Sequence, residues 1–299
     1  MYNPDNNIYL SGFTFCKNAL KLSYPIKATI DCLLYYCDEV IINIGISEDD
    51  TVEYLKGLYG TNPKAKIFIR EWPGKEYKTS FYRNETNFAL EQCTGKFALY
   101  LQGDEVMHED DKGILYQELE SIENDLHIMG LTNRFIHVEG DFNSLRGAYQ
   151  FECRVLRNNG MIESWGDAQS FKLKNTPDNF LWKYRLASTG KPLAPVSKTR
   201  VFHYGFVRPP KAMFEKTWAM DEFYNEPARL KELQDAMITK APDRVWQYGH
   251  WGSMQFHGTH PIFAKEYIRQ FETMFPELVR YPAQFANDDI FPVREVLYI

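Results

Sequence analysis

The chain has 299 residues, 44% of them hydrophobic and 25% charged, which suits a soluble protein of one large or two small domains with a substantial core. The formal net charge of −6 argues against nucleic acid as the main partner, because phosphate binding requires a basic surface. The sequence shows no signal peptide and no apolar run long enough to span a membrane. Five scattered cysteines without a CxxC pair predict buried thiols, so we expect a cytoplasmic protein.

The first hundred residues alternate between strand and helix patterns. Short β-branched or apolar runs indicate buried strands, and segments with apolar residues along one face indicate the helices between them. This alternation predicts an α/β fold with a mostly parallel sheet, which binds ligands beyond the carboxyl ends of its strands. The expected strands are 8–15, 40–46, 66–70 and 97–101, and the expected helices are 26–37, 48–60 and 81–93.

The pattern changes near residue 128, first to strands and loops and then to helices. No internal repeat, low-complexity tract or flexible linker is visible, which favours one compact unit with a helical C-terminal extension. The expected strands are 128–138, 149–156 and 200–204, residues 174–199 read as loop, and the expected helices are 211–225, 227–240 and 261–272.

Four motifs follow one another in the order GISEDDT, SFYRNETNFAL, LYLQGDE and VFHYGF. Together they resemble the nucleotide-sugar-binding domain of GT-A fold glycosyltransferases. The resemblance is strongest to the large inverting, family-two-like group of bacterial polysaccharide and lipopolysaccharide transferases, and it covers about residues 8–208. It implies a Rossmann-like GT-A catalytic domain over residues 1–208, with the helical extension over residues 209–299 packed on it.

In that family a strand ends in Asp-x-Asp, whose carboxylates hold a divalent cation on the donor diphosphate. This chain has Gln102-Gly103-Asp104, so an amide replaces the first acid. The resemblance implies that Asp104 and His203 are metal ligands for Mn²⁺ or Mg²⁺, since hard cations prefer oxygen ligands. A solvated loop for Asp104 and a core histidine for His203 are the structural alternatives.

Further residues match donor-binding positions of the family. Asp49 matches the acidic turn that bonds the base or ribose, although it is also a good helix N-terminal acid. Arg83 matches a position that helps to place the donor in that family, and Arg208, which follows His203 in HYGFVR, is a candidate to bridge diphosphate oxygens with its planar guanidinium. For both residues the alternative is a surface arginine. The amide of Gln102 can orient a ribose hydroxyl or a water.

Inverting transfer needs a general base beside the acceptor hydroxyl. The family usually places an Asp or Glu between the acidic triplet and the histidine. The best match is Asp167 in ESWGDAQSF, with Glu163 second, and Trp165 could stack on a sugar ring. The alternative is a polar turn beside a core tryptophan.

The resemblance implies a glycosyltransferase that moves a sugar from a nucleotide-diphosphate donor to a glycan or glycolipid acceptor with inversion. A glycolipid acceptor would bring the protein to a membrane surface peripherally. One alternative is a nucleotidyltransferase, although the loop SGFTFCKNALK has a single glycine where such enzymes carry a glycine-rich basic loop. The other is a non-catalytic nucleotide-sugar-binding protein. His250, His257 and His260 lie in a C-terminal aromatic cluster for which we expect packing, an acceptor shelf or a dimer contact.

Overall fold

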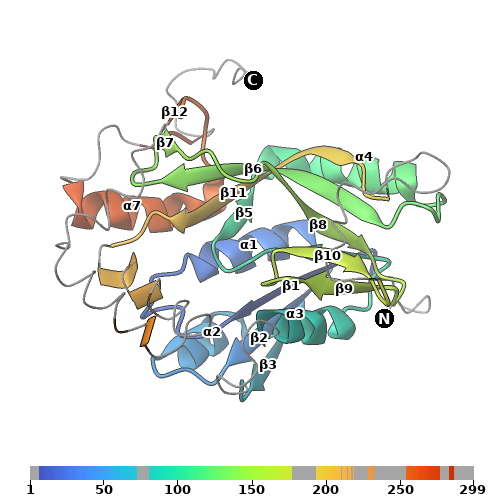
Figure 1. Cartoon of the computed structure of the whole chain (residues 1–299), viewed down its shortest axis with the longest axis horizontal. Helices are drawn as coiled ribbons and strands as arrows, with labels where there is room; N and C mark the ends of the chain where they lie inside the picture. Colours follow the sequence, from blue (N-terminus) through green and yellow to red (C-terminus); the bar gives the residue numbers. More distant parts are fainter. Residues whose placement is uncertain are drawn as a thin grey trace.

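The computed structural model of the chain describes most of the first 176 residues and several later segments (Figure 1). Within these residues, ten strands form one sheet in the order β12-β7-β6-β8-β4-β1-β2-β3, with β11 beside β6 and β5 beside β11. A separate two-stranded hairpin pairs β9 with β10. The described residues are 7–72, 81–176, 193–209, 211–213, 215–216, 218, 228–229, 231, 254–276 and 283–285.

Four neighbouring strands at the N-terminal side of the sheet run parallel, because a helix connects each one to the next along the chain. This arrangement confirms the expected α/β fold with a mostly parallel central sheet flanked by helices. The strands are β1 (Leu10–Cys16), β2 (Glu39–Gly45), β3 (Ala65–Arg70) and β4 (Phe97–Tyr100), and the helices are α1 (Ile26–Tyr36), α2 (Thr51–Tyr59) and α3 (Phe81–Gln92).

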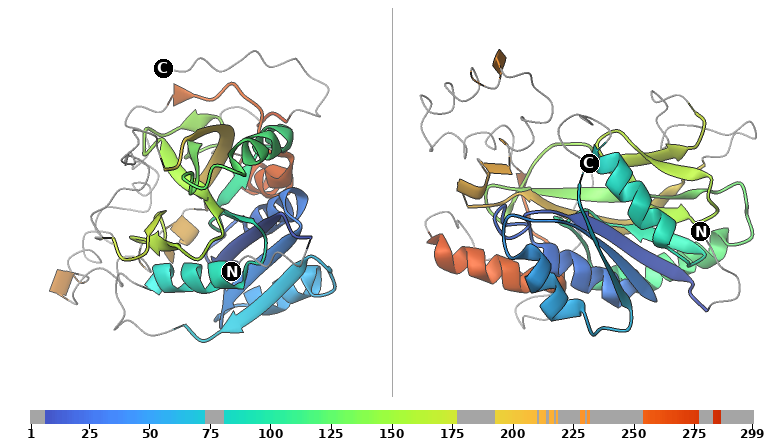
Figure 2. Two further views of the ribbon diagram at one scale, coloured as in Figure 1. Left: turned by 90° about the vertical axis from the view of Figure 1, so that its right-hand side faces the viewer. Right: turned by 90° about the horizontal axis from the view of Figure 1, so that it is seen from below.

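The central strands are buried on both faces, and alternate side chains enter two different cores. Along β2, Val40 and Ile42 join the core that contains α1, whereas Ile41 joins the core that contains α3. The two further views show helices on opposite sides of the sheet (Figure 2). The uninterrupted apolar run of β2 is therefore explained by helix packing on both sides.

The other half of the sheet is mainly antiparallel and brings distant segments beside β4. The strand β11 starts at Val196, inside the range expected to be loop, because its first residues pair in parallel with β6 near Thr132. These elements are β5 (Glu105–Met107), η2 (Glu109–Asp111), α4 (Lys112–Ile122), β6 (Gly130–Glu139), β7 (Ser144–Leu145), β8 (Phe151–Arg157), β9 (Ile162–Trp165), β10 (Ser170–Leu173) and β11 (Val196–Phe206).

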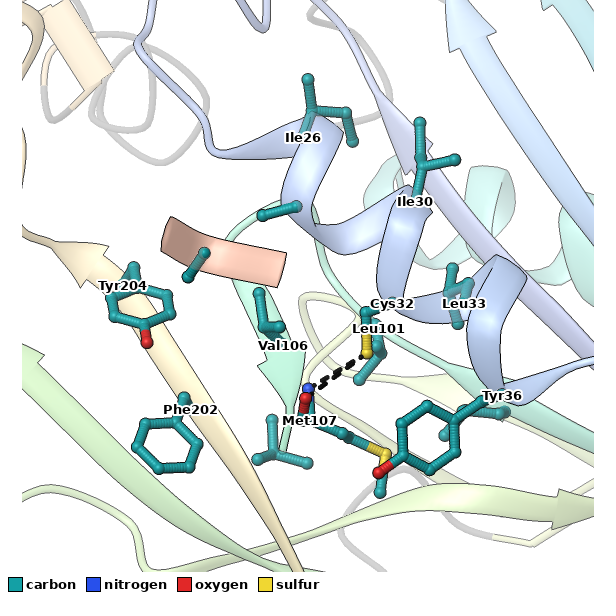
Figure 3. Packing of buried hydrophobic residues seen from close by; sticks show 14 of the residues in the cluster. Ile26, Ile30, Cys32, Leu33, Tyr36, Leu101, Val106, Met107, Phe202 and Tyr204 are labelled. Atoms are coloured by element: carbon teal, nitrogen blue, oxygen red, sulfur yellow. Dashed lines mark hydrogen bonds between the residues drawn. The ribbon is translucent and has the colours of Figure 1, made fainter. Parts of the chain in front are cut away.

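The helix α1 fixes the segment that follows β4 (Figure 3). Its Cys32 Sγ accepts a hydrogen bond from the Met107 backbone N–H at 3.3 Å, and the Tyr36 hydroxyl donates to the His108 carbonyl. All five cysteines are buried free thiols, as the sequence predicted. Because α1 packs on both the parallel strands and β5, it holds the acidic loop at the carboxyl edge of the sheet.

Part of the C-terminal third completes the sheet and the core. The strand β12 (Met254–Gln255) pairs with β7, and α7 (Lys265–Met274), which follows η6 (Ile262–Ala264), buries Ile268 and Phe271 in the α1 core. The helix expected over 261–272 is confirmed, whereas most of 211–225 and 227–240, together with His250, lies outside the described residues. No described helix is long and apolar enough to cross a membrane.

Candidate functional site

The loop after β4 carries two adjacent carboxylates with different surroundings. Glu105 is fully buried and accepts two hydrogen bonds of 2.7 Å from the guanidinium of Arg154, which is also fully buried. Its Oε2 further accepts the backbone N–H of Gln102 at 3.0 Å. Because a buried carboxylate needs such partners, Glu105 is committed to Arg154 and to the Gln102 backbone, and Asp104 makes a separate set of contacts.

Asp104 is 3% exposed and lies among three basic side chains. Its Oδ2 accepts hydrogen bonds from Arg208 at 2.8 Å and Lys216 at 3.1 Å, and its Oδ1 lies 3.7 Å from Nε2 of His203. Burial raises the pKa of the Asp104 carboxyl, but Lys216, His203 and Arg208 outweigh it and hold the pKa well below its usual range. The sequence predicted three members of this cluster and missed Lys216.

The guanidinium of Arg208 is fully buried, and its described bonds tie the cluster to the N-terminal part of the chain. It donates to the carbonyls of Gly205 and Leu22 as well as to Asp104. The ring of Tyr24 stacks on it with the centroid 3.8 Å from the guanidinium carbon. Arg208 therefore acts here as a fixed counter-charge for Asp104.

His203 contacts a second histidine, His137, which lies outside the four sequence motifs. Strands β11 and β6 place His203 and His137 side by side, with their Nδ1 atoms 3.0 Å apart, and Nε2 of His137 lies 2.7 Å from the Tyr149 carbonyl. Burial lowers the pKa of His137, and it lowers the pKa of His203 to about 3, so both rings are neutral at pH 7. A histidine in each of two strands was the available signal, but the sequence gives no register for their pairing.

A divalent cation at Asp104 and His203, as the resemblance implies, does not fit the side chains in this arrangement. The Asp104 carboxylate already carries Arg208 and Lys216, so a doubly charged ion there would meet two positive charges at close range. Among the described residues no group of three His, Cys, Asp or Glu gathers around one point. The amide nitrogen of Gln102 donates to the Ala168 carbonyl at 2.9 Å. Cation binding at Asp104 and His203 therefore stays a prediction of the resemblance alone.

The turn that contains Asp167 is attached to the acidic loop. Gln102 binds the Ala168 carbonyl, and Arg154 donates to the Gln169 carbonyl at 2.6 Å. Ala168 is fully buried with a φ of +54°, a left-handed conformation that alanine rarely adopts and that these contacts maintain. Burial raises the pKa of the Tyr24 hydroxyl to about 12, and the charge of Asp167 contributes in the same direction. The structure therefore brings Asp167 to the Asp104 side of the sheet.

The second candidate base has a different environment. Glu163 lies opposite Lys172 in the β9–β10 hairpin, and the two side chains form an ion pair with 2.8 Å between Nζ and Oε1. The Glu163 carboxylate thus pairs with the opposite strand of the hairpin, whereas Asp167 lies in the connection between the two strands. Of the two acids, Asp167 is the one whose turn is hydrogen-bonded to the acidic loop.

The remaining donor-site candidates lie around the same edge of the sheet. The Asp49 carboxylate accepts the backbone N–H groups of Lys21 at 2.7 Å and Thr51 at 3.1 Å, so it joins the loop after β1 to the start of α2. Arg83 is half-buried in the first turn of α3. A Cβ at Gly103 would lie 3.4 Å from Ile26, an ordinary van der Waals contact, so Gly103 packs against the start of α1.

A groove of about 200 Å³ lies between the loop before α1 and the helix α7. Tyr24 contributes to its wall and also covers Arg208, so the groove and the Asp104 cluster share one aromatic ring. The groove contains none of the basic groups of the cluster. The basic side chains of the cluster and Asp104 therefore lie outside the lining of this groove.

No protein-family model and no curated protein matches the chain. Among solved structures, S. aureus TarS is similar with a TM-score of 0.34 and 20% identity, covering 48% of this chain and 23% of that one. TarS 1–349 in complex with UDP gives the same values with 38% of that chain covered, and its UDP-GlcNAc complex gives 0.31, 21%, 48% and 37%. This chain thus spans well under two thirds of those chains, and a likeness at these TM-scores carries no inference about activity.

Proposed function

We propose that the protein is a glycosyltransferase that moves a sugar from a nucleoside-diphosphate donor to a hydroxyl of a glycan or glycolipid, with inversion. One observation carries the proposal: a buried carboxylate, Asp104, gathers Arg208, Lys216 and His203 beyond the carboxyl end of β4. Sheets with parallel strands and flanking helices bind nucleotides at this edge. A concentration of basic groups there suits the charge of a diphosphate.

The reaction requires a base on the acceptor side and positive charge on the donor side. The acceptor oxygen forms a bond to the anomeric carbon while the bond from that carbon to the diphosphate oxygen breaks. The acceptor proton passes to the carboxylate of Asp167, and the electron pair of the broken bond leaves on the nucleoside diphosphate. The contacts that attach the Asp167 turn to the acidic loop support this assignment.

Other residues have supporting roles in the proposal. Asp49 and Arg83 lie at the ends of neighbouring elements where a base, a ribose or a phosphate would extend from Asp104. In the proposal, Gln102 and Gly103 lie between the donor diphosphate and the turn that contains Asp167, to which Gln102 is hydrogen-bonded. A peripheral contact with a membrane follows only if the acceptor is a glycolipid.

The first test of this function is thermal unfolding with UDP, GDP, dTDP or CDP, followed by donor turnover. A nucleotide at 100 times its Kd stabilises the protein by about 2.7 kcal/mol, which raises the Tm measurably. We expect Asp167→Asn to keep this nucleotide response and to lower sugar transfer by roughly 10²–10⁴-fold, the usual contribution of a general base. The matched control is Glu53→Gln, an exposed acid on α2 that should change neither property.

The outcomes separate the alternatives. A chain that responds to none of the four nucleotides contradicts the proposal, and a nucleotide response without turnover in the wild type identifies a non-catalytic binding protein. Loss of transfer in Glu163→Gln but not in Asp167→Asn would assign the base to Glu163. Release of pyrophosphate from a nucleoside triphosphate would instead identify a nucleotidyltransferase.

A further inference from the structure

Lys216 is the member of the Asp104 cluster that no sequence motif marks. Its ammonium donates to Asp104 Oδ2 and to the Gly205 carbonyl, both at 3.1 Å, and its side chain is 13% exposed. The rings of Tyr24 and Phe206 lie 5.3 and 5.8 Å from Nζ. Lys216 is therefore held in one place by two oxygen acceptors and two aromatic faces, close to the surface.

The histidine pair places a further acceptor atom beside Asp104. A carbonyl can only accept, so His137 Nε2 carries the proton that binds Tyr149, and His137 Nδ1 has a lone pair that accepts from His203 Nδ1. The neutral ring of His203 consequently has its lone pair on Nε2, the atom 3.7 Å from Asp104 Oδ1. Asp104 and the Gly205 carbonyl thus accept from Lys216, and Nε2 of His203 is a further acceptor atom beside Asp104.

The backbone at Gly205 lies tightly inside this group. A Cβ there would be 2.4 Å from His203 Nε2 and 3.0 Å from Asp104 Oδ2, so only glycine lets the chain pass between them. Carboxylate oxygens, carbonyl oxygens and imidazole nitrogens are ligand atoms that suit a divalent cation. In this chain the ammonium of Lys216 already contacts two of these groups, the Asp104 carboxylate and the Gly205 carbonyl.

Arg208 cannot serve the same purpose, although it shares the carboxylate. Its side chain is fully buried, and its Nε, Nη1 and Nη2 donate to Gly205, Leu22 and Asp104. Lys216 is partly exposed and makes two hydrogen bonds with the described residues, which leaves one N–H of the three for a ligand. Of the two cations on Asp104, Lys216 is the one that a diphosphate oxygen can reach.

We propose that Lys216 is the built-in cation of the donor site, standing on Asp104 in place of a divalent metal and neutralising the donor diphosphate so that binding needs no metal. The role toward the diphosphate rests on the function proposed above. The occupancy of the Asp104 position by Lys216 does not depend on that function.

The first experiment uses Mn²⁺ alone as the probe and follows its binding by electron paramagnetic resonance. Wild type should show no Mn²⁺ site that depends on Asp104. Lys216→Met removes the charge and keeps the length of the side chain, so it should gain one Mn²⁺ site, which Lys216→Met/Asp104→Asn should lose again. A wild-type site abolished by Asp104→Asn overturns the inference, and so does a Lys216→Met protein that gains no site.

The second experiment measures the affinity for the nucleoside diphosphate that stabilises the wild type, in EDTA and in Mn²⁺. Wild type should bind equally in both. Lys216→Met should bind at least about tenfold more weakly in EDTA, the value of one lost charge-assisted hydrogen bond, and Mn²⁺ should restore part of the loss. Lys211→Met, which removes an exposed lysine of the same segment, is the control and should match wild type.

The two proposals fail in different ways. If wild type binds a nucleoside diphosphate only with Mn²⁺, Lys216 is not the cation and the transferase function stands. If no nucleoside diphosphate binds but the Mn²⁺ experiment gives the expected gain and loss, the proposed function fails while Lys216 remains the cation on Asp104.

Discussion

Adjacent carboxylates in one loop have opposite electrostatic properties because their partners differ. For Glu105, burial raises the pKa and Arg154 offsets this only in part, whereas for Asp104 the surrounding basic groups outweigh burial and the pKa falls. Glu105 and Arg154 form a fully buried ion pair, whereas Asp104 belongs to a cluster whose member Lys216 is partly exposed. The two neighbouring carboxylates thus make separate sets of contacts.

The buried pair gives a stability prediction. Glu105→Gln should lower the free energy of unfolding by about 3–5 kcal/mol, because it leaves the charge of Arg154 buried without its carboxylate. Urea unfolding at pH 7 measures the change. Adding Arg154→Met should recover much of the loss, since both charges are then absent. A loss below about 1 kcal/mol in the single variant would show that solvent reaches this pair.

At the residue scale, the sequence predicted the members of the site that lie in recognisable motifs. Asp104 and His203 follow or occupy strands whose order could be read from the chain, and the structure places them together. Lys216 and His137 could not be found in this way, because their roles depend on contacts over 112 and 66 positions. A lysine in the segment FEKTW has no local feature that distinguishes it from a surface lysine.

At the element scale, strong periodicity predicted the elements that are long and doubly covered. The four parallel strands and three connecting helices occur where expected, within a few residues. The short strands β5, β9 and β10 were missed, because three or four residues carry too little pattern and depend on their partners. The early start of β11 has the same origin, since pairing with β6 decides it.

Two glycines in regular elements give a matched pair of predictions. Gly57 lies inside α2 with no atom within 4 Å of an added Cβ, so Gly57→Ala should stabilise the protein by about 0.5–1 kcal/mol through helix propensity. Gly130 begins β6, and an added Cβ would lie 2.2 Å from the Val155 carbonyl oxygen, so Gly130→Ala should destabilise it. Urea midpoints measure both changes, and equal signs for the two would contradict this account.

At the scale of the whole molecule, His260 connects the C-terminal segment to the sheet. It is fully buried, its Nε2 lies 2.7 Å from the Phe142 carbonyl, and its Nδ1 lies 2.9 Å from the Tyr204 hydroxyl. A neutral ring satisfies both contacts, as donor to the carbonyl and acceptor from the hydroxyl. Burial lowers the pKa of His260 to about 4, with His108 as the nearby titratable ring. For this histidine, the packing role expected from the sequence agrees with its burial.

This connection predicts a loss of stability in mild acid. The unfolded chain binds a proton at His260 below about pH 6.5, whereas the folded chain does so only near pH 4, so stability falls as the pH decreases through this window. Each pH unit costs up to about 1.4 kcal/mol from this group. His260→Gln should be less stable at pH 7 but should show a flatter dependence in urea unfolding. The exposed neighbour His257→Gln should keep the wild-type slope, and an equally steep slope in His260→Gln would contradict the assignment.

The distances along the chain between Asp104 and its cations have a consequence for the order of folding. Arg208 and Lys216 lie 104 and 112 positions after Asp104, whereas the parallel strands and their helices are complete within the first hundred residues. Closing such long loops is slow compared with forming local βαβ contacts. During refolding, the four parallel strands and their helices should therefore form first, and the ability to bind a nucleotide should return in a later, separate kinetic phase.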